Sequence, residues 1–137
     1  MLRWTIAVAL LAMFSGCGGD DLEKSIVSGT ITYEGQPIAN GDIMFYPKAG
    51  TAGPVSGAPI RNGEYTADGK GGVPVGEHRV EIRAFRVRET TVLPEGMSAE
   101  DMPGQRLQYL PAEFNSQTTL EASIATGERR QTVNFDL

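Results

Sequence analysis

The residues that could do chemistry are few in this chain of 137 residues, which has one histidine and one cysteine. His78 begins a stretch in which it shares a face with Val80 and Ile82, so we expect it at the edge of the core. A metal site needs more His or Cys ligands than the chain has, and no Gly-x-Ser-x-Gly elbow marks a nucleophilic serine. We predict no enzyme, no catalytic residue, no metal and no cofactor. A hydrolase that uses His78 stays open as an alternative.

Charged and glycine-rich motifs give no further site. The acidic pairs Asp20-Asp21 and Glu100-Asp101 lack the spacing of a calcium loop. The run 69–72 (Gly-Lys-Gly-Gly) lacks the spacing of a phosphate loop. The chain carries a formal net charge of −5 and no basic stripe, which argues against a nucleic-acid partner.

Cys17 stands at the end of an N-terminal segment with the features of an export signal. Met1-Leu2-Arg3 is a short basic start, and an apolar run follows from Trp4 to Phe14. As a helix this run would span about 16 Å, roughly half of a bilayer's hydrocarbon core. It is therefore too short to cross a membrane and fits the hydrophobic region of a signal peptide.

The segment 14–17 (Phe-Ser-Gly-Cys) resembles the lipobox of bacterial lipoprotein precursors, although that family usually has Leu in place of Phe14. The resemblance implies a signal peptide at 1–16 that is removed, a diacylglycerol on the Cys17 thiol, and acylation of the new amino group, for example with palmitate. Two or more acyl chains hold a protein stably in a membrane. Two alternatives are an ordinary secretory signal cut near Ser15 or Gly16, which leaves Cys17 as a free thiol, and a plain membrane anchor.

The rest of the chain divides into a polar tether and one domain. Residues 17–25 hold the lipidated cysteine and a flexible, polar segment, and residues 26–137 form the domain. Apolar and polar residues alternate with period two along short stretches of it, which is typical of half-buried strands. These stretches are residues 26–33, 43–46, 64–67, 77–87, 118–124 and 131–137. Their spacing predicts an all-β sandwich or barrel of six or seven strands.

Three details of this prediction are specific enough to check. Residues 47–59 hold three prolines and three glycines, so we expect a loop with at most a brief edge strand near Val55. In the strand 77–87, Phe85 and Val87 fall on the charged face, which predicts a bulge or twist there. Residues 88–106 form a long polar loop with one helical turn at 98–101.

Several segments together resemble carboxypeptidase regulatory-like domains. Residues 27–38 (VSGTITYEGQPI) resemble the opening strand and turn of that family, and residues 62–66 (NGEYT) and 75–82 (VGEHRVEI) resemble two later strands. His78 stands where the family commonly has Tyr or Thr. Residues 109–115 (YLPAEFN) are similar to a late motif of planctomycete-type lipoproteins. The resemblance implies a transthyretin-like (prealbumin-like), seven-stranded Greek-key sandwich and no known chemistry.

The expected function is therefore that of an extracytoplasmic protein, anchored by lipid on Cys17 to the cell membrane or the outer membrane. Its sandwich would be a structural module of the cell envelope, or would bind a protein partner there. A carbohydrate-binding accessory module is the main alternative, because Tyr46, Phe85, Tyr109 and Phe114 could form a platform on which sugars stack. Where these four rings point distinguishes the two.

Overall fold

Stretches of alternating apolar and polar residues form the strands of the computed structural model, which describes residues 21–87, 95–98 and 106–137. The strands are β1 (Lys24–Tyr33), β2 (Gln36–Pro37), β3 (Asn40–Pro47), β4 (Ser56–Arg61), β5 (Glu64–Ala67), β6 (Val73–Pro74), β7 (Gly76–Val87), β8 (Arg106–Gln108), β9 (Glu121–Ile124), β10 (Arg130–Thr132) and β11 (Phe135–Asp136). Two short 3₁₀ turns, η1 (Gly69–Gly71) and η3 (Ala112–Phe114), lie between them, and the described residues contain no α-helix. The all-β class is confirmed.

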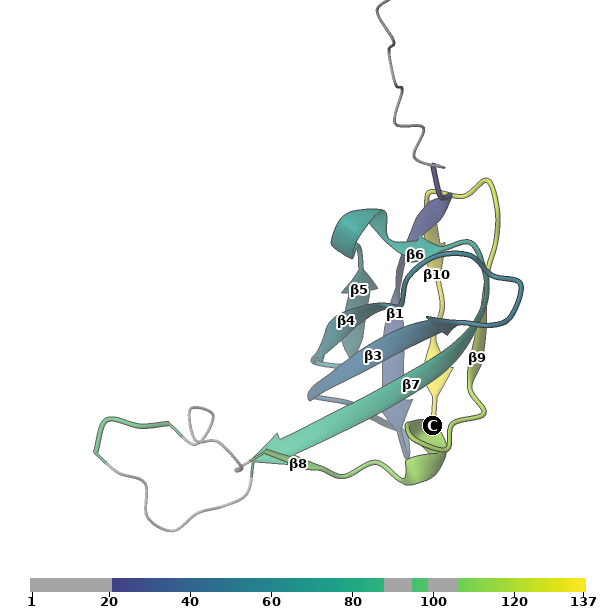
Figure 1. Cartoon of the computed structure of the whole chain (residues 1–137). Helices are drawn as coiled ribbons and strands as arrows, with labels where there is room; N and C mark the ends of the chain where they lie inside the picture. The colour runs from purple at the N-terminus through teal and green to yellow at the C-terminus, as the bar shows by residue number, and fades with distance from the viewer. Residues whose placement is uncertain (1–20, 88–94, 99–105) are drawn as a thin grey trace, which may run out of the picture.

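The strands form one strongly curled sheet (Figure 1). Its main path is β10-β1-β5-β4-β3-β7-β8, with β9 also paired to β7. The pairs are antiparallel except that β10 and β11 run parallel to β1. The backbone N–H and C=O of Ala125 each bond to the side-chain amide of Gln131, at 2.8 Å, where β9 leads into β10. A side chain thus joins the two edges of the curled sheet without a strand ladder.

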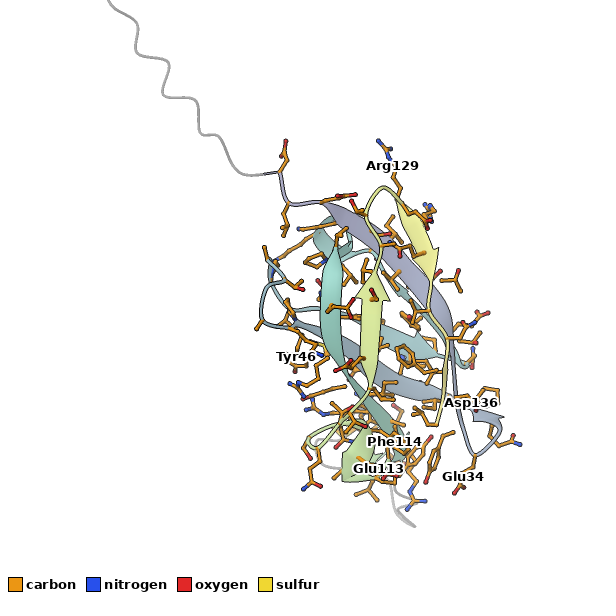
Figure 2. The ribbon with its side chains drawn as sticks, turned by 90° about the vertical axis from the view of Figure 1, so that its right-hand side faces the viewer. Glu34, Tyr46, Glu113, Phe114, Arg129 and Asp136 are labelled. Atoms are coloured by element: carbon orange, nitrogen blue, oxygen red, sulfur yellow. The ribbon has the colours of Figure 1, made fainter. Side chains whose placement is uncertain are left out.

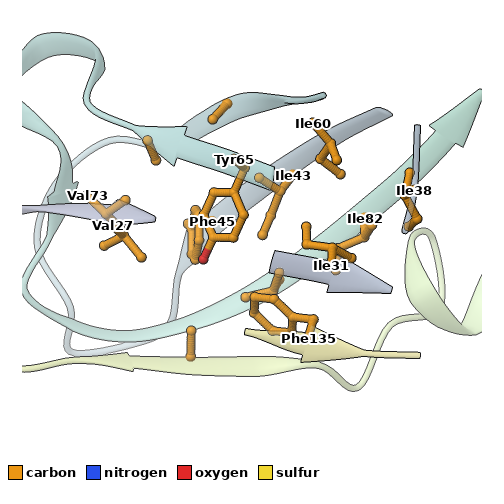
Figure 3. Packing of buried hydrophobic residues seen from close by; sticks show 14 of the residues in the cluster. Val27, Ile31, Ile38, Ile43, Phe45, Ile60, Tyr65, Val73, Ile82 and Phe135 are labelled. Carbon is orange, nitrogen blue, oxygen red and sulfur yellow. The ribbon is translucent and has the colours of Figure 1, made fainter. Parts of the chain in front are cut away.

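The inward faces of the strands meet in one core (Figure 3). Val80, Ile82 and Ala84 are fully buried, as the alternation predicts. Ala122 and Ile124 of β9 are also buried, opposite His78 and Gly76 of β7. The buried apolar side chains are Val27, Ile31, Ile38, Ile43, Phe45, Ala58, Ile60, Tyr65, Ala67, Val73, Val80, Ile82, Ala84, Leu110, Ala122, Ile124 and Phe135. The hydroxyl of Tyr65 reaches through this core and donates to the Val133 carbonyl at 2.7 Å.

Two glycines satisfy backbone demands that a side chain would violate. A Cβ on Gly29 would lie 2.0 Å from the Val133 carbonyl oxygen, because the C-terminal segment passes directly over β1 there. Gly63 has φ of 80° and Asn62 has φ of 50° in the two-residue turn that joins β4 to β5. Positive φ at both positions is the geometry that Asn-Gly favours in hairpins.

β4 overturns part of the predicted loop at 47–59. Residues 56–61 pair with β3 along their whole length, from Ser56 opposite Phe45 to Arg61 opposite Asn40. The proline is tolerated because the ladder with β5 covers only Ile60 and Arg61, so Pro59 lies where β3 is the sole partner. Ala58 and Ile60 are buried and Pro59 is exposed, so the strand alternates although its composition is that of a loop.

Of the bulge or twist predicted near Phe85, the bulge is wrong. β7 keeps one register against β3 from His78 to Ala84 and continues in register against β8 from Phe85 to Val87. Phe85 therefore stays on the outer face, where the guanidinium of Arg106 lies 4.6 Å from its ring centroid. A neighbouring cation covers the ring, so no change of register is needed. Of the predicted helical turn at 98–101, residues 99–101 lie outside the described residues.

Candidate functional site

His78 is the one histidine, and the structure places it in the core. It is fully buried on the inward face of β7, with its ring edge-on to Phe45 at a centroid distance of 6.2 Å. Its Nδ1 lies 3.1 Å from the Gly76 carbonyl oxygen, and its Nε2 has no hydrogen-bond partner among the residues the structure describes. Burial lowers the pKa of His78, against the opposing effects of the Gly76 carbonyl and the Glu77 charge. The ring is neutral and out of reach of solvent.

The end of the domain where the chain enters the sheet is more ordered than the sequence predicts. β1 begins at Lys24, and Ser25 is fully buried opposite Val73, so both belong to the sheet. The Glu23 carboxylate accepts hydrogen bonds from the Gly127 amide at 2.5 Å and the Thr126 hydroxyl at 2.7 Å. These bonds lower the pKa of Glu23, that from Gly127 most. We call this contact the Glu23 clasp: it fixes the entering chain to the β9–β10 turn. Cys17 itself lies outside the described residues.

The charged outer face of β7 is internally paired. Glu81, 7% exposed, binds Arg79 through Oε1 at 2.7 Å and Arg83 through Oε2 at 3.1 Å. The guanidinium of Arg79 also lies 4.5 Å above the ring of Tyr46. A groove of about 640 Å³ runs beside this ring, and its Lys48 and Glu121 pair with each other at 2.5 Å. Each of these charges therefore has a partner of opposite sign, and Arg79 and Arg83 share the Glu81 carboxylate.

The aromatic side chains that could stack on sugars do not form one platform. Tyr46 and Phe85 are both on the outer face, but Tyr46 lies opposite Arg79, six residues from Phe85 along β7. At about 3.3 Å per residue this separates the two by about 20 Å. Tyr109 and Phe114 instead pack on Tyr33, at centroid distances of 6.3 and 6.0 Å, and are half-buried against the core.

The remaining motifs bring no chemistry together. Residues 69–72 form η1 and its exit, a turn beside β6. Glu100, Asp101 and Asp20 lie outside the described residues. Within 21–87, 95–98 and 106–137, no three His, Cys, Asp or Glu side chains are placed to hold a metal ion. No helix in the same ranges is long and apolar enough to cross a membrane.

Comparison of the chain with protein-family models, with curated proteins and with solved structures found no match. The resemblance to carboxypeptidase regulatory-like domains stays a prediction from the residues that carry it.

Proposed function

We propose that the chain is a lipoprotein whose β-sandwich is held at an extracytoplasmic membrane surface by lipid on Cys17. The observation that carries the proposal is the N-terminal pattern: a basic start, an apolar run too short to span a bilayer, and Ser15-Gly16 directly before the only cysteine. A lone cysteine in an exported protein calls for an explanation, and lipidation supplies one.

The start of the folded domain limits how far an anchored domain could lie from the bilayer. Only residues 18–22 separate Cys17 from the Glu23 clasp, and fully extended they reach no more than about 20 Å. An anchored domain would therefore stay close to the bilayer. The end that carries the Glu23 clasp, β6 and the β9–β10 turn would face the lipid, and the end with β8 and η3 would face away (Figure 1).

The role we propose for the domain is structural or partner-binding rather than catalytic. His78 is buried with no serine or carboxylate bonded to it among the described residues, and it does not line the groove beside Tyr46. The separation of Tyr46 from Phe85 argues against a flat sugar-stacking platform. For the fold we propose the Greek-key, transthyretin-like type; the all-β sheet, curled around one core, supports it.

The test compares the full chain with Cys17→Ser in a bacterial host that makes lipoproteins, by phase separation in a cloud-point detergent. We expect the wild type in the detergent phase and the variant in the aqueous phase, because a serine hydroxyl cannot form the thioether to the diacylglycerol. As a control for the export signal, Ser15→Ala keeps a small residue in the segment before the cysteine and should partition like the wild type. If the wild type and Cys17→Ser both stay in the aqueous phase, the proposal is wrong.

A further inference from the structure

The sheet opens where β7 leaves β3. The last paired residues are Ala84 of β7 and Gly41 of β3, and beyond them β7 pairs with β8 alone, through Phe85–Val87. These two strands form an arm that projects from the sandwich (Figure 1). Between the arm and the ends of β3 and β4 lies a cavity of about 270 Å³. We call it the arm notch; the residues of its lining used below are Asn40, Asp42, Arg61, Phe85, Arg86 and Arg106.

The arm notch is positively charged on a chain whose net charge is −5. Arg61, Arg86 and Arg106 line it together with one acid, Asp42. Arg86 directly follows Phe85 on β7 and its guanidinium lies over Tyr109 on the opposite face of the arm, so the cationic groups on the side of the notch are those of Arg61 and Arg106. The ion pairs of the described residues are Lys48 with Glu121, and Arg79 and Arg83 with Glu81. None of them involves an arginine of the notch, so among the described residues the guanidinium groups of Arg61 and Arg106 carry no paired carboxylate. A concave site lined by one sign of charge concentrates ligands of the opposite sign.

The guanidinium groups are held by uncharged neighbours. Arg106 lies over the Phe85 ring at 4.6 Å, and Arg86 lies over the Tyr109 ring at 5.9 Å. The Nη1 of Arg61 donates to the Asn40 side-chain oxygen at 3.4 Å. Stacking uses the flat face of a guanidinium and leaves the N–H donors along its edge for another partner. Such edges match the two or three oxygens of an oxyanion.

We propose that the arm notch binds a small molecule about the size of one ring through its oxyanion group. This group is a carboxylate, a sulfate ester or a phosphate ester. Arg61 and Arg106 supply the charge and the donors, and the cavity volume sets the size. This inference goes beyond the proposed function and does not depend on lipid at Cys17. The site lies at the end of the domain away from the Glu23 clasp (Figure 1).

The test is calorimetric titration of the protein expressed from the full chain and purified in a non-ionic detergent. The probes are D-glucuronate, D-glucose as its neutral counterpart, sulfate and inorganic phosphate. The variants are Arg61→Gln and Arg106→Gln, both exposed, and the control is Arg129→Gln, which removes the same charge in the β9–β10 turn at the opposite end. Thermal unfolding of each variant verifies that it folds.

We expect saturable binding of at least one anion, none of glucose, and an affinity about tenfold to a hundredfold weaker in each notch variant. Arg129→Gln should bind like the wild type. Tighter binding of glucuronate would identify a carboxylate ligand, and tighter binding of sulfate or phosphate an ester or the free ion. No saturable binding of any anion, equal binding of glucose, or an equal loss in Arg129→Gln would overturn the proposal.

Discussion

At the scale of single residues, His78 shows how burial decides what a reactive side chain can do. Its ring is fully buried, and the one hydrogen bond of its Nδ1 is local, to the Gly76 carbonyl two residues away. Desolvation disfavours the charged imidazolium, so the pKa of His78 is lowered relative to that of the unfolded chain. The residue that sequence alone offers first for catalysis is thus a neutral part of the core.

This burial predicts a loss of stability in mild acid. Above the unfolded pKa of 6.5 both states are neutral at this position and His78 gives no pH dependence. As pH falls through 6.5 the unfolded chain binds the proton first, so stability decreases until the pH reaches the lower folded pKa. The free energy of unfolding measured in urea should therefore be lower at pH 5.5 than at pH 7.5. His78→Gln should make the free energy of unfolding less dependent on pH in this range. An unchanged pH dependence in the variant would mean that other groups cause it.

Gly29 predicts a sharper effect of a single methyl group. A Cβ there would lie 2.0 Å from the Val133 carbonyl oxygen, so Gly29→Ala must push the C-terminal segment off β1. We expect the free energy of unfolding to fall by about 3 kcal/mol, which is at the upper end of the range for overpacked sites. Gly69→Ala is the matched control, because nothing lies within 4 Å of its Cβ position. Chemical denaturation of both checks this; a Gly29→Ala protein as stable as Gly69→Ala would contradict the close approach.

At the scale of elements, period-two alternation was a sufficient guide wherever apolar residues mark one face. It placed β1, β5, β7 and β9, and the inward residues Val27, Ile82 and Ile124. It failed for β4, because Gly57 and Pro59 occupy the outward positions and hide the alternation of Ala58 and Ile60. It also missed β8, which has only three residues, a leucine between two polar side chains. Such a short segment shows no alternation of its own, and it is a strand because it pairs with β7.

The arm notch could not be predicted from the sequence, because its residues come from separate strands. Arg61 and Arg106 come from β4 and β8 and are separated by 45 positions in the chain. Only the strand register, with Arg106 opposite Val87 and Arg61 opposite Asn40, brings them to one place. Sequence reasoning could have noted the arginines, but not their shared cavity.

The Gln131 side chain holds the end of β9 beside β10, and its removal gives a testable prediction. Gln131 satisfies both the N–H and the C=O of Ala125, at 2.8 Å each. Gln131→Ala removes both bonds at a partly exposed site, so we expect the free energy of unfolding to fall by about 1 kcal/mol. We also expect faster hydrogen exchange of the Ala125 amide. Gln117→Ala is the control, since Gln117 is exposed and its side chain has no hydrogen bond within the described ranges. Equal effects of the two variants would show that Gln131 does not join the edges.

At the scale of the whole molecule, the short distance from Cys17 to the Glu23 clasp predicts an orientation. Arg129 and Glu113 are exposed at opposite ends of the domain (Figure 2). Cys17 is the only cysteine and its sulfur would carry lipid, so Arg129→Cys and Glu113→Cys each offer one free thiol for a fluorophore. In vesicles with quencher-labelled headgroups we expect stronger quenching at position 129. Equal quenching would contradict the orientation, even for an anchored protein.

We propose above all that the mature protein carries lipid on Cys17, and intact mass spectrometry can decide this. We expect a polypeptide that begins at Cys17, lacks residues 1–16, and carries the added mass of a diacylglycerol with or without a further acyl chain. Fragmentation should place that mass on the first residue. A mature chain that begins elsewhere, or begins at Cys17 with a free thiol, would contradict the claim and leave a secreted domain without an anchor.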